Sequence, residues 1–157
     1  MFKIQTKNPT ETSAWAESVG TKVVPGLVLC LDGDLGAGKT LFVQGLAKSL
    51  HIQEEVTSPT FNLMNIYEGD CVLHHFDLYR LETEDELDEI GFYEYSEAVD
   101  DVVIIEWSDK FIDCLPEDYI HIELDRTGKE DERTITVSLH GEKNQKFYEE
   151  LEKSCRF

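Results

Sequence analysis

The amino-acid sequence predicts an α/β fold with a mixed, mainly parallel central sheet flanked by helices. Two continuously apolar stretches, residues 27–31 and 102–105, are typical of strands that are buried on both faces of a parallel sheet. A glycine-rich loop and then an amphipathic helical repeat, at about 42–50, follow the first stretch. The chain has 157 residues, of which 41% are apolar, so we expect one domain spanning 1–157 with a single core.

The other segments alternate between strand and helix patterns. Two sequence signals mark the start of a helix most clearly. Asn8 followed by Pro9 is one, and the other is Thr83 with Glu86 three residues later, a pair that forms a capping box. The further expected strands are residues 2–6, two strands within 60–77, and a hairpin of 119–124 with 133–139; the further expected helices are residues 9–20, a short acidic helix from 83, and a terminal helix at about 142–153.

Charge and cysteine spacing exclude several classes of protein. The formal net charge is −19, with 14 basic against 33 acidic residues, so no basic stripe is available for autonomous nucleic-acid binding. No stretch approaches the roughly 20 apolar residues of a membrane span, and the N-terminus lacks a signal-peptide pattern, so we expect a cytoplasmic protein without a membrane partner. The four cysteines form no C-x-x-C pair, which gives little support to a zinc site or a disulfide framework.

The loop after the first apolar stretch fits the phosphate-binding pattern G-x-x-x-x-G-K-[ST] and lies between an expected strand and an expected helix. In a P-loop, backbone N–H groups and the helix N-terminus bind phosphates, Lys39 reaches the β and γ oxygens, and the Thr40 hydroxyl binds magnesium. A plain glycine turn is the alternative. We therefore expect a P-loop NTPase whose nucleotide contacts are Asp34, Leu35, Gly36, Ala37, Gly38, Lys39, Thr40 and Leu41.

A P-loop needs an acidic residue near its metal, and Glu106 stands at the end of the second apolar strand, where a Walker B acid would lie. A solvated glutamate at a strand end is the alternative. Trp107, the next residue, could stack on an adenine ring or a partner surface, although packing is the commoner role of such an aromatic residue.

The segment HHFDLYRL, residues 74–81, contains a second candidate acid. Asp77 ends an alternating strand, and if that strand lies next to the P-loop strand, Asp77 faces the magnesium and Arg80 fixes a carboxylate or phosphate oxygen. A surface ion pair is the alternative. Adjacent His74 and His75 point to opposite faces of a strand, so a zinc site built on both is a weak hypothesis.

In TSPTF, residues 57–61, Thr60 offers a hydroxyl where nucleotide switches often place one.

Together, GDLGAGKT, TSPTF, HFDLYRL and IIEW occur in an order and spacing that resemble the TsaE family, small bacterial ATPases of tRNA threonylcarbamoyladenosine biosynthesis. The resemblance covers roughly residues 5–141. It implies ATP hydrolysis with magnesium and work alongside two partner proteins, TsaD and TsaB, with tRNA reached only through that complex. Carried over by position, Lys39 and Thr40 bind nucleotide and magnesium, Thr60 is the switch threonine, Asp77 and Glu106 are the acidic pair, and Trp107 is the aromatic residue beside them.

The resemblance further implies nucleotide contacts at about residues 8–12 and at Arg133, and it has one departure. The family usually has a second threonine after the P-loop threonine, and this chain has Leu41 there. Two other functions remain open. A small-molecule phosphotransferase would normally bring several arginines to its site, but the four arginines here are few and dispersed. A regulatory module that binds nucleotide without turnover would lack the acidic residues that hydrolysis needs. The presence of Asp77 and Glu106 counts against this function.

Overall fold

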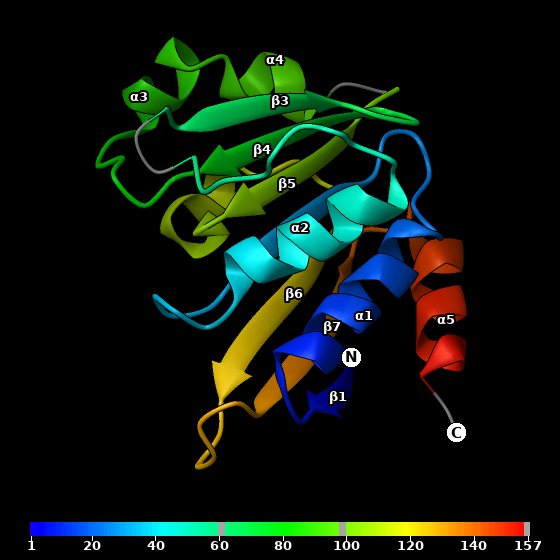
Figure 1. Ribbon diagram of the computed structural model, residues 1–157. Helices are drawn as coiled ribbons and strands as arrows, with labels where there is room; N and C mark the ends of the chain where they lie inside the picture. Colours follow the sequence, from blue (N-terminus) through cyan, green and yellow to red (C-terminus); the bar gives the residue numbers. More distant parts are fainter. Residues whose placement is uncertain (60–61, 98–99, 156–157) are drawn as a thin grey trace.

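The protein forms a single seven-stranded sheet covered by helices on both faces (Figure 1). The computed structural model describes residues 1–59, 62–97 and 100–155. The strands are β1 (Phe2–Thr6), β2 (Val28–Asp32), β3 (Met64–Glu68), β4 (Val72–Asp77), β5 (Val102–Glu106), β6 (Tyr119–Arg126) and β7 (Arg133–His140). The helices are α1 (Pro9–Gly20), α2 (Lys39–Ser49), α3 (Glu84–Glu89), α4 (Phe92–Ser96), the 3-10 segment η1 (Ser108–Cys114) and α5 (Gln145–Ser154).

The strand order is β1-β7-β6-β2-β5-β4-β3. The four central strands β6, β2, β5 and β4 are parallel to one another, whereas β7, β1 and β3 join through antiparallel pairings. Because β1 is antiparallel to β7, which is antiparallel to β6, β1 points the same way as the four parallel strands. The predicted mixed, mainly parallel sheet flanked by helices is therefore confirmed.

Alternation along the strands divides the core into two clusters, one on each face of the sheet. All five residues of β2 are buried; Leu29 and Leu31 face the cluster that includes α1, α2 and α5, and Val28 and Cys30 face the cluster that includes α3, α4 and η1. Helices α1 and α2 pack closely at Gly45, where a Cβ atom would lie 2.7 Å from the Ser13 carbonyl oxygen.

The expected helix starts are present. Asn8 accepts a hydrogen bond from the Glu11 N–H at 2.9 Å, and Thr83 and Glu86 form the capping box of α3. Two short elements, α4 and η1, were not predicted, because pieces of five and seven residues are too short to show a helical period. In the parts of the chain that the structure describes, no helix combines the length and apolarity required to traverse a bilayer.

Candidate functional site

The carboxyl ends of β2, β5 and β4 meet at one edge of the sheet, beside the loop that joins β2 to α2 (Figure 1). A cavity of about 260 Å³ opens there. Ligands of open α/β sheets commonly bind at this edge, outside the carboxyl ends of the strands. The cavity is lined by Leu35, Gly36, Gly38, Lys39, Thr40, Leu41, Ser58, Asp77, Tyr79, Glu106 and Trp107.

The P-loop presents backbone donors at the start of α2. Gly36 and Gly38 have φ values of 80° and 111°, left-handed conformations that side chains strongly disfavour. The backbone N–H groups of residues 38–41 donate to no described residue. Ala37 differs from our expectation, since its N–H donates within the loop to the Asp34 carbonyl oxygen at 3.0 Å. The remaining donors and the helix N-terminus suit phosphate oxygens.

Lys39, the P-loop lysine, is buried and folds back on its own loop. Its Nζ atom donates to the carbonyl oxygens of Gly33 and Asp34, the second at 3.2 Å, and lies 4.3 Å from the centre of the Trp107 ring. Burial lowers the pKa of Lys39, and the carboxylates of Glu106 and Asp77 oppose that shift. The ammonium group can exchange these carbonyl oxygens for phosphate oxygens without leaving the cavity.

Asp77 and Glu106 are paired in register at the ends of β4 and β5, and each is at most 4% exposed. The Asp77 strand does not lie next to the P-loop strand, which was the condition on which we expected Asp77 to face the magnesium, because β5 lies between β4 and β2. Asp77 still reaches the cavity, since parallel in-register strands end at the same edge. One of its oxygens, Oδ1, accepts the Tyr79 N–H at 2.9 Å.

His75 orients Glu106, a role that our sequence analysis missed. Its Nε2 atom lies 2.5 Å from Glu106 Oε2, and the imidazole is fully buried. His74, on the opposite face, pairs instead with Asp101 at 2.7 Å and stacks on Tyr95. The two imidazoles therefore serve different carboxylates and do not share a site. A signal was available in the sequence, because His75 precedes Asp77 by two positions and so shares its face of the strand.

Trp107 and Tyr79 form an aromatic wall at the cavity mouth. Their ring centroids are 4.9 Å apart, and Trp107 adopts a left-handed backbone conformation with φ of 58°. Tyr79 was also missed, although it follows Asp77 by two residues. An aromatic wall of this kind can pack against a base or against a partner protein.

A buried hydrogen-bonded group fixes the chain immediately after Trp107. Asp32, the last residue of β2, accepts the Ser108 N–H at 2.8 Å and the Ser108 hydroxyl at 2.5 Å. His121 of β6 lies with Nε2 at 2.7 Å from the same carboxylate. The hydrogen bond to Asp32 raises the pKa of His121. Asp32 thus joins the P-loop strand to the turn that carries Trp107.

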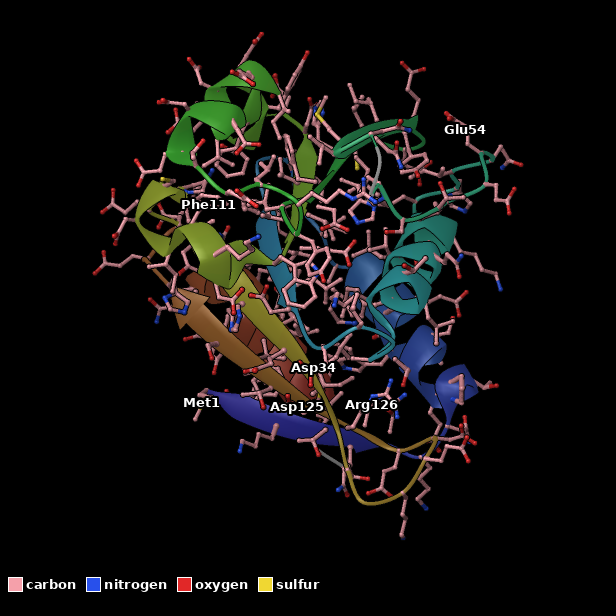
Figure 2. All side chains as sticks on the ribbon, turned by 90° about the vertical axis from the view of Figure 1, so that its left-hand side faces the viewer. Met1, Asp34, Glu54, Phe111, Asp125 and Arg126 are labelled. Carbon is pink, nitrogen blue, oxygen red and sulfur yellow. The ribbon has the colours of Figure 1, made fainter. Side chains whose placement is uncertain are left out.

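Two of the four arginines hold the P-loop from β6 and β7, so our description of the arginines as dispersed is wrong. Arg126 donates to the Leu35 carbonyl oxygen at 3.2 Å, and Arg133 donates to that of Ala37 at 2.8 Å. They meet because Arg126 and Arg133 are paired in register at the end of the hairpin. Figure 2 views this edge of the sheet and shows Arg126 near Asp34. Their donors face loop carbonyl oxygens, which makes these arginines supports of the loop.

The donor set fits a magnesium ion that arrives with a nucleotide. Magnesium usually keeps several waters and takes one or two protein carboxylates together with phosphate oxygens. Thr40, Asp77 and Glu106 line one cavity and supply such a partial set. Among the residues that the structure describes, no group of three or more histidine, cysteine or acidic side chains could hold an ion by itself. A cavity lined both by a loop with unpaired backbone donors and by carboxylates suits a nucleotide with its cation.

The other residues predicted to contact the nucleotide do not all lie at the cavity. Thr60 lies outside the described residues. Leu41 lines the cavity, as does Ser58 of the TSPTF segment, whereas Arg80 is exposed on the turn after β4 and is not among the lining residues. Residues 8–12 do not line the cavity either; they cap α1 through Asn8.

Comparisons with known proteins agree with this geometry. The family model described as "Threonylcarbamoyl adenosine biosynthesis protein TsaE" matches residues 6–135. The tRNA threonylcarbamoyladenosine biosynthesis protein TsaE of Bacillus subtilis is 40% identical over 151 residues, which covers 96% of this chain and 93% of that protein. The protein of the same name from Treponema pallidum is 41% identical over 132 residues, 84% and 96% of the two chains.

A solved structure has the same fold. The crystal structure of Bacillus subtilis YdiB superimposes with a TM-score of 0.82 at 36% identity, covering 99% of this chain and 96% of that one. The match extends over the whole P-loop fold, including the two antiparallel edges. The chain therefore belongs to the TsaE family of threonylcarbamoyl adenosine biosynthesis proteins.

Proposed function

We propose that this protein is a magnesium-dependent ATPase of tRNA threonylcarbamoyladenosine biosynthesis, acting in the cytoplasm on a complex of TsaD and TsaB. One observation carries the ATPase part: Lys39 and Thr40 share a cavity with the buried, in-register pair Asp77 and Glu106. The family to which the chain belongs supports the pathway, and tRNA would be reached only through the partners.

Each group in the cavity has a role that follows from its chemistry. The unpaired N–H groups of residues 38–41 and the Lys39 ammonium bind the phosphates. Magnesium, when bound, neutralises charge on the β and γ oxygens, and Thr40 with the two carboxylates would hold it. His75 occupies Oε2 of Glu106, while Oε1 accepts no hydrogen bond from a described residue. That second oxygen is suited to orient an attacking water or a water of the ion.

The isolated protein should turn over slowly. None of the arginines that the structure describes lines the cavity, and the donors of Arg126 and Arg133 contact loop carbonyl oxygens, so little positive charge is available to offset charge that develops on the γ-phosphate. A partner would complete the site. The exposed acidic segment at residues 82–89, which includes α3, would dock on a basic partner surface. The response of the TSPTF segment to bound ATP or ADP would control this docking.

A small-molecule phosphotransferase is the second candidate. It uses the same P-loop, but it must clamp a second anionic substrate beside the γ-phosphate, usually with arginines. The convergence of Arg126 and Arg133 on the loop brings two arginines close to the nucleotide. Because these side chains support loop carbonyl oxygens, we favour the ATPase.

The deciding experiment follows phosphate release from ATP and co-elution on a sizing column, with purified TsaD and TsaB present or absent. We expect slow release alone, faster release on mixing, and co-elution that is stronger with ATP than with ADP and weaker at raised salt. Equal co-elution in every condition, with no rise in phosphate release, would contradict the partner-dependent ATPase. Transfer of labelled phosphate to a metabolite would favour the phosphotransferase instead.

A further inference from the structure

Strands β2 and β5 end in two segments that shape the nucleotide cavity, the P-loop and the turn that carries Trp107. Their backbone pairing stops at Leu31 and Glu106. Beyond that point the ladder no longer holds Gly33, where the P-loop begins, at a fixed distance from Trp107. The next residue of β2, Asp32, provides the missing link through its side chain.

The Asp32 carboxylate points toward η1, because it shares its face of β2 with Cys30, which belongs to the core cluster on that side. Its Oδ1 atom accepts the Ser108 N–H at 2.8 Å, and Oδ2 accepts the Ser108 hydroxyl at 2.5 Å. Asp32 is 7% exposed and Ser108 is 2% exposed. Hydrogen bonds to a buried carboxylate are short and strong, so Ser108 keeps a fixed position relative to the end of β2.

Trp107 depends on this anchor. Its φ of 58° is a left-handed conformation, which a bulky residue keeps only where the surrounding structure holds it. Ser108 follows directly, as the first residue of η1. The centre of the Trp107 ring lies 4.3 Å from Lys39 Nζ. Holding Ser108 therefore also holds the ring that covers the P-loop lysine.

The charge of Asp32 reaches the same lysine. Burial lowers the pKa of Lys39, and the carboxylates of Glu106, Asp77 and Asp32 oppose that shift, in this order. Asp32 is not among the residues that line the cavity. It acts on Lys39 from behind, through its charge and through the position of the Trp107 ring.

His121 brings a titratable group to the Asp32 carboxylate. Its Nε2 atom lies 2.7 Å from Asp32 Oδ2. The His121 side chain is 25% exposed, whereas that of Asp32 is 9% exposed, so the imidazole can exchange a proton with solvent while the carboxylate stays covered. The hydrogen bond to Asp32 raises the pKa of His121, although burial opposes the shift.

The other ionisable groups around His121 leave that proton under the control of carboxylates. These groups are Cys30 of β2, Asp109 of η1, Tyr119 and Glu123 of β6, and His140 of β7. Glu123 and Asp109 favour the charged imidazole. Burial raises the pKa values of Cys30 and Tyr119 and lowers that of His140, so these three are uncharged near neutral pH.

From these contacts we propose that Asp32 is a positioning residue of the nucleotide site, which holds Trp107 over Lys39 through Ser108, and does so more firmly when His121 is protonated. A charged donor strengthens the hydrogen bonds of the carboxylate that it shares with Ser108. As pH rises through the raised pKa of His121, the charge is lost and the turn that carries Trp107 is held less tightly. The effect on turnover rests on the ATPase activity proposed above, whereas the effect on the position of Trp107 does not.

The first test follows the indole N–H signal of Trp107 by NMR in ¹⁵N-labelled, nucleotide-free protein from about pH 6 to about pH 9, with Trp15→Phe to assign it. We expect the signal to titrate with a midpoint above 6.5, the ordinary pKa of histidine. The titration should disappear in His121→Gln and remain in His140→Gln, the matched control, because the His140 ring is 6.3 Å from that of His121 and its lowered pKa gives it no charge in this range. A Trp107 signal that does not titrate, or that titrates in His121→Gln as in the parent, would overturn the proposal.

The second test measures phosphate release against ATP concentration. Ser108→Ala removes one of the hydrogen bonds to Asp32, and Asp32→Asn removes the charge. Each should lower kcat at least about fivefold and change KM less than about twofold, because the ring moves while the phosphate donors of the P-loop stay. The kcat ratio of the parent to His121→Gln should shrink as pH rises.

Melting temperatures above the assay temperature show that the variants are folded. Parental kcat in both Ser108→Ala and Asp32→Asn would refute the positioning role. If the parent itself releases no phosphate, the proposed ATPase fails, and the Trp107 titration alone decides whether Asp32 and His121 position the ring.

Discussion

The imidazole Nε2 of His75 lies 2.5 Å from the Glu106 carboxylate oxygen Oε2, and both side chains are buried. The contact crosses from β4 to β5 and fixes the Glu106 side chain, which lines the cavity. When a residue that hydrogen-bonds to a metal-binding carboxylate is mutated, activity or metal affinity typically falls by about 10–100-fold.

Replacing His75 by Phe should therefore lower ATP turnover by about 10–100-fold and raise the magnesium concentration needed for half-maximal rate. His75→Gln, which keeps a donor, should recover part of the loss. The measurements are phosphate release against magnesium concentration and ADP binding without magnesium, which should not change. The control is His74→Phe, a buried neighbour on the other face that pairs with Asp101. An unaltered magnesium dependence in His75→Phe would contradict the positioning role.

Lys39→Ala removes the charged donor of the P-loop. Loss of its contact to the β and γ oxygens should cost roughly 2–4 kcal/mol in nucleotide binding or transition-state stabilisation, and hydrolysis should disappear. Calorimetric ATP titration and a coupled phosphate assay measure the two effects. Lys48→Ala, in the same helix but 78% exposed, is the control and should behave as the parent does. ATP turnover at the parental rate by Lys39→Ala would refute the P-loop assignment.

The acidic pair is tested by Asp77→Asn and Glu106→Gln, which preserve volume but remove charge. Each should abolish magnesium-dependent turnover, because the ion loses a carboxylate or the water loses its acceptor. Folding is checked by the melting temperature, which should stay close to that of the parent. Glu68→Gln on the edge strand β3 is the matched control, since that side chain is exposed and remote from the cavity. Normal hydrolysis by both cavity variants would remove them from the metal site.

The Asp32 and His121 pair predicts a pH-dependent contribution to stability. Hydrogen bonding to Asp32 raises the folded-state pKa of His121 above its ordinary value of 6.5, so the stabilisation is complete below about pH 6.5 and is lost as pH rises through the raised pKa. Glu123 and Asp109 act in the same direction. The melting-temperature difference between the parent and His121→Gln should therefore shrink from about pH 6 to pH 9.

His140 provides an internal control for that measurement. Burial and the nearby His121 charge lower the pKa of His140, so its contribution is lost as pH falls below about 6.5. The difference between the parent and His140→Gln should thus change with pH in the opposite sense. A difference for His121→Gln that stays constant across the range would show that the Asp32 contact does not involve a charged imidazole.

The sequence predicted the main elements because their signals are local. The P-loop spacing, the apolar strand β5 and the capping box at Thr83 each depend on residues a few positions apart. Contacts between distant strands have no such signal. The insertion of β5 between β2 and β4 depends on the order of the whole sheet, and a chain read in sequence order does not reveal it.

The same limit explains the supporting residues that were missed. Arg126 and Arg133 meet at the P-loop only because β6 and β7 pair in register and bring residues about 90 positions away to the loop carbonyl oxygens. His75 and Glu106 are likewise 31 positions apart in the sequence, and they meet only because β4 and β5 pair. Residues that bind a ligand directly stand in compact motifs, whereas those that hold them in place are scattered along the chain.

The contact between Lys39 and Trp107 gives the molecule a fluorescent reporter of its own. The ammonium group lies over the indole ring at 4.3 Å, so its transfer to a phosphate would change the electric field at the ring and with it the emission wavelength. The only other tryptophan, Trp15, packs beside Phe42 and Cys155, outside the cavity, and would give a steady background. Nucleotide arrival could therefore be followed in real time by stopped flow, without any label attached.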